Sequence, residues 1–136
     1  MRKIIPSLFA ALTIACSDIE ETPGGIAVDK NGYNPDMSLI DRKYTLVEDC
    51  VRELGLPIQG QRDSLLVLIV TNEDWFTCEA SLTGRCRGLY FIDRGQISIP
   101  ENLKAFGYES GHHIGQSLET EGPAETCGNH VDHMKY

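Results

Sequence analysis

The run SLLVLIVT (residues 64–71) decides the fold that the sequence predicts. It is almost entirely apolar and rich in branched side chains, which is typical of a strand buried on both faces. A short strand of this kind is stable only when other elements cover it. The segments on either side of it therefore indicate how the domain is completed.

A helix is predicted before this strand, over SLIDRKYTLVEDCVRELGLP (residues 38–57). Apolar side chains recur there every three or four residues, which places them on one face of a helix. Ser38 is expected to cap the start of the helix, and Gly55, with Pro57 beyond it, to end it. The apolar face consists of Ile40, Tyr44, Val47, Val51 and Leu54.

A hairpin and a second helix are predicted after the strand. GLYFI (residues 88–92) and QISIP (residues 96–100) flank the turn sequence DRG. Pro100 suits the first turn of a helix that continues to about Leu118, and an irregular tail follows. The order of helix, strand, loop, hairpin and helix predicts an α+β domain over residues 38–136, with a sheet of a few strands.

The first residues are typical of an export signal. MRKIIPSLFAALTIAC (residues 1–16) has a basic start and an apolar stretch. That stretch is shorter than the ~20 apolar residues needed to span a bilayer, and it fits the central region of a secretory signal peptide. We expect a signal peptide over residues 1–15 and a flexible tether over residues 16–37, which are rich in Gly, Pro, Asn and acids.

The residues around Cys16 indicate how the exported chain is held. The sequence LTIAC resembles the lipobox of bacterial lipoproteins, in which cleavage precedes a cysteine that is then acylated. The resemblance implies a membrane anchor at Cys16 and a place in the bacterial cell envelope, with Ser17 favouring the outer membrane. The alternative is an ordinary signal peptide in which Cys16 has no such role.

The charge balance limits the partners of the chain. It contains 12 Lys and Arg against 20 Asp and Glu, a formal net charge of −8. Nucleic acid is not expected as a partner, because its phosphates require a basic face. Electrostatic adhesion to anionic lipid is disfavoured for the same reason, so membrane attachment would come through the lipid at Cys16.

Four further cysteines predict two disulfides in an oxidising compartment. They are Cys50, Cys78, Cys86 and Cys127. Three pairings are open, although a local bridge between Cys78 and Cys86 would close the polar loop that separates them. A cysteine-rich zinc site is the weaker alternative, because no CxxC pair occurs.

The stretch YESGHHIG (residues 108–115) carries the chemistry that the sequence predicts. On a helix, Tyr108 and His112 share one face and Glu109 lies close beside it. The stretch resembles the HExGHxxG form of the metal-binding helix of zincin metallopeptidases. The matching residues are Glu109, Gly111, His112 and Gly115, whereas Tyr108 stands where the first histidine ligand is expected.

This resemblance implies a zincin-like fold, a zinc ion and a peptide or protein substrate. It assigns Glu109 as the general base, His112 as a helix ligand, and His130 or His133 as the distal ligand. All the histidines of the chain fall between residues 112 and 133, a clustering that favours metal binding.

Three arrangements of the site remain open. Zinc is held by His112, His130 and His133, or a shifted register makes Glu109 and His113 the ligands. In the third arrangement there is no metal and the scaffold has lost its activity. Tyr108 is a further candidate ligand, although phenolate is uncommon near neutral pH. The favoured function is a zinc-dependent peptidase at the cell envelope, and the alternative is a non-catalytic lipoprotein that binds metal or a protein partner.

Overall fold

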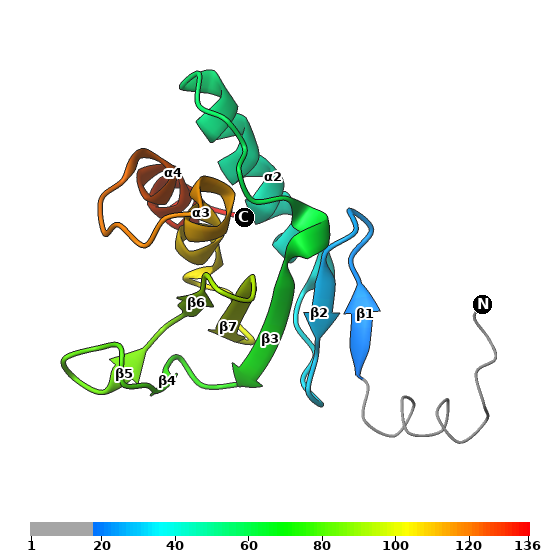
Figure 1. Ribbon diagram of the computed structural model, residues 1–136. Coiled ribbons are helices and arrows are strands. Elements are labelled where there is room, and N and C mark those ends of the chain that lie inside the picture. The colour runs from blue at the N-terminus through cyan, green and yellow to red at the C-terminus, as the bar shows by residue number, and fades with distance from the viewer. Residues whose placement is uncertain (1–17) are drawn as a thin grey trace.

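A computed structural model describes residues 18–136, so the predicted signal peptide and Cys16 lie outside the described residues. The predicted α+β class is confirmed (Figure 1). In chain order the elements are β1 (Ile19–Glu21), β2 (Ala27–Asp29), α2 (Met37–Glu53), the 3-10 turn η1 (Arg62–Ser64), β3 (Leu66–Thr71), β4 (Phe76–Thr77), β5 (Arg85–Cys86), β6 (Leu89–Phe91), β7 (Gln96–Pro100), α3 (Phe106–Gly115) and α4 (Pro123–Asp132).

The main sheet has the strand order β1-β2-β3-β7-β6, with β3 at its centre. Strands β2 and β7 run parallel to β3, whereas β1 and β6 are antiparallel edge strands. Burial alternates along β3, because Val67 and Ile69 are fully buried and their neighbours only partly so. The expectation that both faces of this strand are buried was therefore wrong.

The flexible tether expected over residues 16–37 instead contributes two strands to the main sheet within its described part. Strand β2 pairs in parallel with β3, and β1 pairs with β2. Ile26 and Val28 are fully buried in the core. Two three-residue strands among Gly, Pro and Asn residues carry too little periodicity to be recognised, so the domain starts earlier than the predicted residue 38.

Helix α2 agrees closely with the prediction. Ile40, Tyr44, Val47 and Val51 are buried as expected, while Leu54 is exposed beyond the last turn. The start differs, because the side chain of Asp36 accepts the hydrogen bond from the Leu39 amide at 3.1 Å and Ser38 does not cap the helix.

The hairpin of β6 and β7 is confirmed, but the segments after it differ from the prediction. Pro100 ends β7, and α3 begins at Phe106, after a turn in which the buried Leu103 has a positive φ of 61°. The tail expected to be irregular contains α4, which starts at Pro123 in the favourable first-turn position.

Both predicted disulfides are present. Cys50–Cys127 joins α2 to α4 across 77 residues of sequence, and Cys78–Cys86 closes the hairpin of β4 and β5. Because the unfolded chain loses more freedom when a longer loop is closed, the first bridge should contribute about 4–5 kcal/mol and the second about 2–3 kcal/mol. The first therefore helps to fix the position of α4.

Glycines allow α3 and α4 to cross at close range. A Cβ at Gly107 would lie 2.6 Å from the carbonyl oxygen of Gly128, so no larger residue fits there without moving a backbone. Helix α3 packs against β6 and β7 on one side and against α4 on the other (Figure 1). This crossing brings the end of α4 beside the first turn of α3.

Candidate functional site on helix α3

The start of α3 is held by a carboxylate from α4. Asp132 accepts hydrogen bonds from the backbone amides of Gly107, at 2.7 Å, and Tyr108, at 2.8 Å. These are two of the amides that the first turn of a helix leaves without an internal partner. Asp132 also forms an ion pair with Lys43 of α2 at 2.8 Å. The position of Tyr108 and Glu109 is therefore set by all three helices.

Glu109 lies in the wall of a cleft of about 560 Å³. Its side chain makes no hydrogen bond within the described residues, and the residue is only 6% exposed. Burial, and then the negative charge of Asp132, raise the pKa of Glu109 to about 8. At neutral pH it is therefore an acid that can donate a proton, not the ionised base of a zincin. The cleft is also lined by Arg87, Gly88, Lys104, Tyr108, Asp132 and His133.

His112 is fixed by a buried carboxylate. Its Nδ1 lies 2.8 Å from Oε2 of Glu125 and 2.9 Å from the carbonyl oxygen of Ser117, so this nitrogen carries the hydrogen and donates. Its Nε2 has no hydrogen-bond partner among residues 18–136. The ring of Tyr108 packs edge-on against His112 with the ring centroids 4.7 Å apart, which confirms the predicted shared face.

Glu125 was missed as a site residue by sequence reasoning. It belongs to an acidic run, with Glu119 and Glu121, that is typical of a solvated loop, yet it is only 1% exposed. The available signal was the sequence GPAE, in which proline opens a helix and the acid falls in its first turn. Recognising α4 would have placed Glu125 at the favourable end of a helix dipole.

His113 is a structural residue on the other side of α3. Its Nε2 donates to the carbonyl oxygen of Gln61 at 2.7 Å, and its Nδ1 accepts from the Tyr90 hydroxyl at 2.8 Å. Burial lowers the pKa of His113, so the ring is neutral, as this pair of bonds requires. Both ring nitrogens are occupied, which argues against the shifted register in which Glu109 and His113 are ligands.

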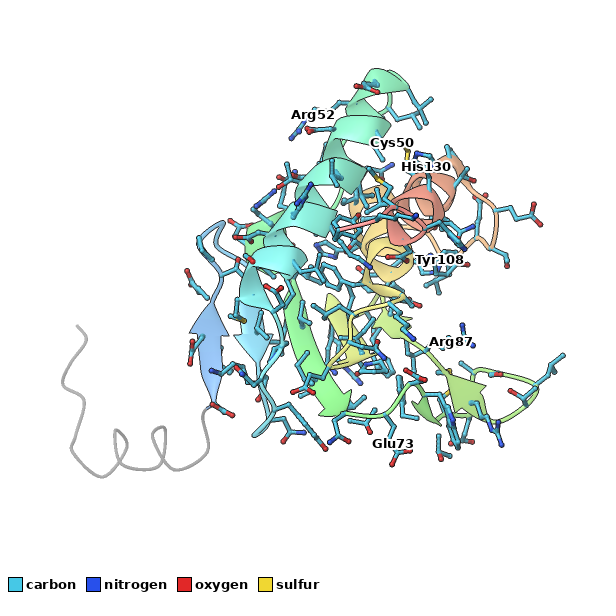
Figure 2. The ribbon with its side chains drawn as sticks, turned by 180° about the vertical axis from the view of Figure 1, so that it is seen from behind. Cys50, Arg52, Glu73, Arg87, Tyr108 and His130 are labelled. Atoms are coloured by element: carbon cyan, nitrogen blue, oxygen red, sulfur yellow. A yellow bond between two sulfur atoms is a disulfide. The ribbon has the colours of Figure 1, made fainter. Side chains whose placement is uncertain are left out.

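The two remaining histidines of the predicted zinc site are not gathered with His112. His130 is exposed over a hollow formed with Cys50 and Leu54, away from Tyr108 (Figure 2). His133 lines the cleft of Glu109, and its Nδ1 donates to the carbonyl oxygen of Asn129 at 2.8 Å. Within the part of the chain that the structure describes, no three His, Cys, Asp or Glu side chains are placed to hold a metal.

Tyr108 does not supply the missing ligand. Its hydroxyl donates to the carbonyl oxygen of Thr120 at 3.2 Å. Burial, followed by the charges of nearby glutamates, raises the pKa of Tyr108, so the phenol keeps its proton at neutral pH. The donors in this arrangement do not fit the four-coordinate set that zinc requires, and we derive no catalytic step through a metal.

The comparisons with known proteins add no family to this geometry. A scan against family models, a search of curated proteins and a search of solved structures each found no match to this chain. The zincin resemblance rests on the helix motif alone and stays a prediction.

Replacing Glu109 by Gln should change how stability depends on pH. The folded state raises the pKa of Glu109 from 4.5 to about 8, so the contribution of this group is fully present below pH 4.5 and is lost as the pH rises through about 8. Gln carries no charge at any pH. Between pH 4.5 and about 8 the wild type should therefore lose stability, whereas Glu109→Gln should not. The difference in the free energy of unfolding, measured in urea, should change in favour of Glu109→Gln by at most about 1.4 kcal/mol per pH unit. The exposed Glu53→Gln is the matched control, and a difference that stays constant with pH would contradict the assignment.

Proposed function

We propose that this domain binds an extended peptide along the open edge of β6, without the hydrolytic zinc chemistry of zincins. The observation that carries the proposal is the position of β6. It is an edge strand, and the residues that lead into it, Arg87 and Gly88, line the cleft of Glu109. An edge strand beside a cleft is the arrangement by which proteins add a peptide as an extra strand.

The two edges of the sheet differ in how well they would accept a peptide. Strand β1 contains Glu20 and Glu21, and Glu20 forms an ion pair with Lys30 at 2.7 Å. Charged side chains of this kind protect an edge from pairing. Strand β6 has the sequence LYF, and Leu89 and Phe91 are partly exposed. The apolar edge is therefore the one suited to a partner strand.

The side chains around α3 support binding over peptide hydrolysis. The raised pKa of Glu109 leaves it protonated near neutral pH, whereas a zincin base must accept a proton from water. The Tyr108 phenol is likewise protonated. His130 and His133 lie in different hollows. These features favour the non-catalytic alternative that the sequence left open.

Peptide binding should be visible at β6 and not at β1. We expect a pool of acetylated random pentapeptides, half with free and half with amidated C-termini, to shift the backbone amide signals of Leu89–Phe91 in NMR spectra of the exported chain. The amides of Ile19–Glu21, at the opposite edge, serve as the internal control. Shifts at neither edge, or at β1 alone, would refute the proposal.

A metal-binding function is the second candidate, and the bond between His112 and Glu125 favours it. A carboxylate on one ring nitrogen is the usual means of orienting a metal-bound histidine. Tyr108→His would place a second imidazole against His112. We expect zinc affinity to rise more than tenfold, or by more than ~1.4 kcal/mol, in a calorimetric titration.

The control for this titration is the double variant Tyr108→His/His112→Ala, which should lose the gain. Glu109→Gln should leave it intact, because the predicted base is not a ligand. If Tyr108→His binds zinc no better than the wild type, the helix does not have the geometry of a zincin metal site.

We also propose that the chain is exported and anchored by a lipid on Cys16. Two disulfides fit an oxidising compartment. No helix among the described residues is long and apolar enough to cross a bilayer. Cys16→Ser should abolish incorporation of labelled fatty acid and release the protein from membranes. Equal labelling of wild type and variant would contradict the anchor.

A further inference from the structure

We infer that the cleft at the start of β6 binds the C-terminal carboxylate of a peptide that runs antiparallel to this strand. The inference rests on the proposed peptide binding and adds the direction and the recognised end of the ligand. It is carried by the position of the cleft along β6 and by the two cations at its rim, Arg87 and Lys104.

Because the cleft lies at one end of β6, the direction of a bound peptide decides which of its two ends reaches the cleft. Arg87 and Gly88 immediately precede β6, so the cleft lies at the N-terminal end of the strand. Lys104, in the turn before α3, reaches the same cleft. A strand added antiparallel to β6 would have its C-terminal end there, whereas a parallel strand would have its N-terminal end there.

The charges around the cleft favour a carboxylate over an ammonium group. Arg87 makes no ion pair or hydrogen bond within residues 18–136. Lys104 has only a 3.4 Å contact with Asp74, and both side chains are about two-thirds exposed, so this pair is weak. The second acid of the cleft, Asp132, is already occupied by Lys43 and two backbone amides. A peptide ammonium would therefore face two cations without a free partner.

An arginine at the rim suits a carboxylate in geometry as well as charge. The guanidinium of Arg87 can form two parallel hydrogen bonds with the two carboxylate oxygens. Arg87 directly follows β5 and lies between the β4–β5 hairpin and the helix that carries Tyr108 (Figure 2). Its side chain is exposed, so it can turn toward a ligand in the cleft.

Glycine at position 88 lets Glu109 and Ile99 pack closely against the backbone that leads into β6. A Cβ there would lie 2.8 Å from Cγ of Glu109 and 3.1 Å from Cδ1 of Ile99. The volume of about 560 Å³ lies within the range of small-ligand sites and has room for a terminal residue with its carboxylate. The cleft therefore has the size, charge and position that a peptide C-terminus requires.

The experiment compares two ligand pools on the exported, disulfide-bonded chain. Acetylated random pentapeptides with a free C-terminal carboxylate and the same peptides as carboxamides are titrated separately, and apparent affinities are taken from the amide shifts of Leu89–Phe91. We expect the carboxylate pool to bind at least tenfold more tightly. Arg87→Ala should reduce the ratio of the two affinities to less than about twofold by weakening carboxylate binding alone.

Two control variants remove the same charge elsewhere. Arg94→Ala lies beyond the C-terminal end of β6, where a parallel peptide would place its carboxylate. Arg52→Ala lies near the end of α2, far from the cleft (Figure 2). Neither should change the preference for the carboxylate pool.

The outcomes separate this inference from the proposal on which it rests. If both pools shift β6 with equal affinity, peptide binding stands and the carboxylate site is refuted. If neither pool binds, the proposed function fails and the inference fails with it. Sensitivity to Arg94→Ala but not to Arg87→Ala would indicate a parallel peptide and overturn the inference. If Arg52→Ala lowers the preference for the carboxylate pool as much as Arg87→Ala does, the effect comes from net charge alone, and the inference is overturned.

Discussion

The buried ion pair between Lys43 and Asp132 is the constraint on which the arrangement of the helices depends. Both side chains are more than nine-tenths buried, and Lys43 also donates to the carbonyl oxygen of Leu103 at 2.8 Å. Asp132 in turn holds the first turn of α3. Loss of either partner would leave a buried charge uncompensated, at a cost of about 3–5 kcal/mol. The pair thus joins α2, α3 and the end of α4, and with them sets the wall of the cleft.

Local patterns predicted the elements that are long or strongly periodic. The apolar stripe of α2, the central strand and the hairpin were all found, because each is specified within its own segment. Strands β1 and β2 were missed because three residues carry little periodicity, and α4 was missed because its start was taken for part of a tail. The shared face of Tyr108 and His112 followed from helix geometry alone. Contacts between segments far apart in the sequence could not be predicted in this way. Asp132 lies 89 positions from its partner Lys43. His130 lies beside Cys50 and not beside His112.

Helix α3 resembles a metal-binding helix in sequence, but the fold gives its side chains different partners from those of a metal site. Helix α3 still presents a tyrosine and a histidine on one face with a glutamate beside them. Glu109 is buried beside Gly88, at the start of β6, and Asp132 of α4 adds a negative charge nearby; both effects favour the protonated acid. Helix α4 also engages His112 through Glu125. Beside these groups lies the cleft between α3 and the start of β6, with two exposed cations, Arg87 and Lys104, in its lining.

Lys43 and Asp132 act as a coupled pair that, together with the Cys50–Cys127 bridge and the close packing of α3 on α4, holds the three helices. A double-mutant cycle of Lys43→Met and Asp132→Asn, followed by urea unfolding, measures this directly. We predict that each single variant loses about 3–5 kcal/mol and that the double variant loses at least ~2 kcal/mol less than the sum. Losses that add to within ~0.5 kcal/mol would show that the two residues act independently, and would contradict the account.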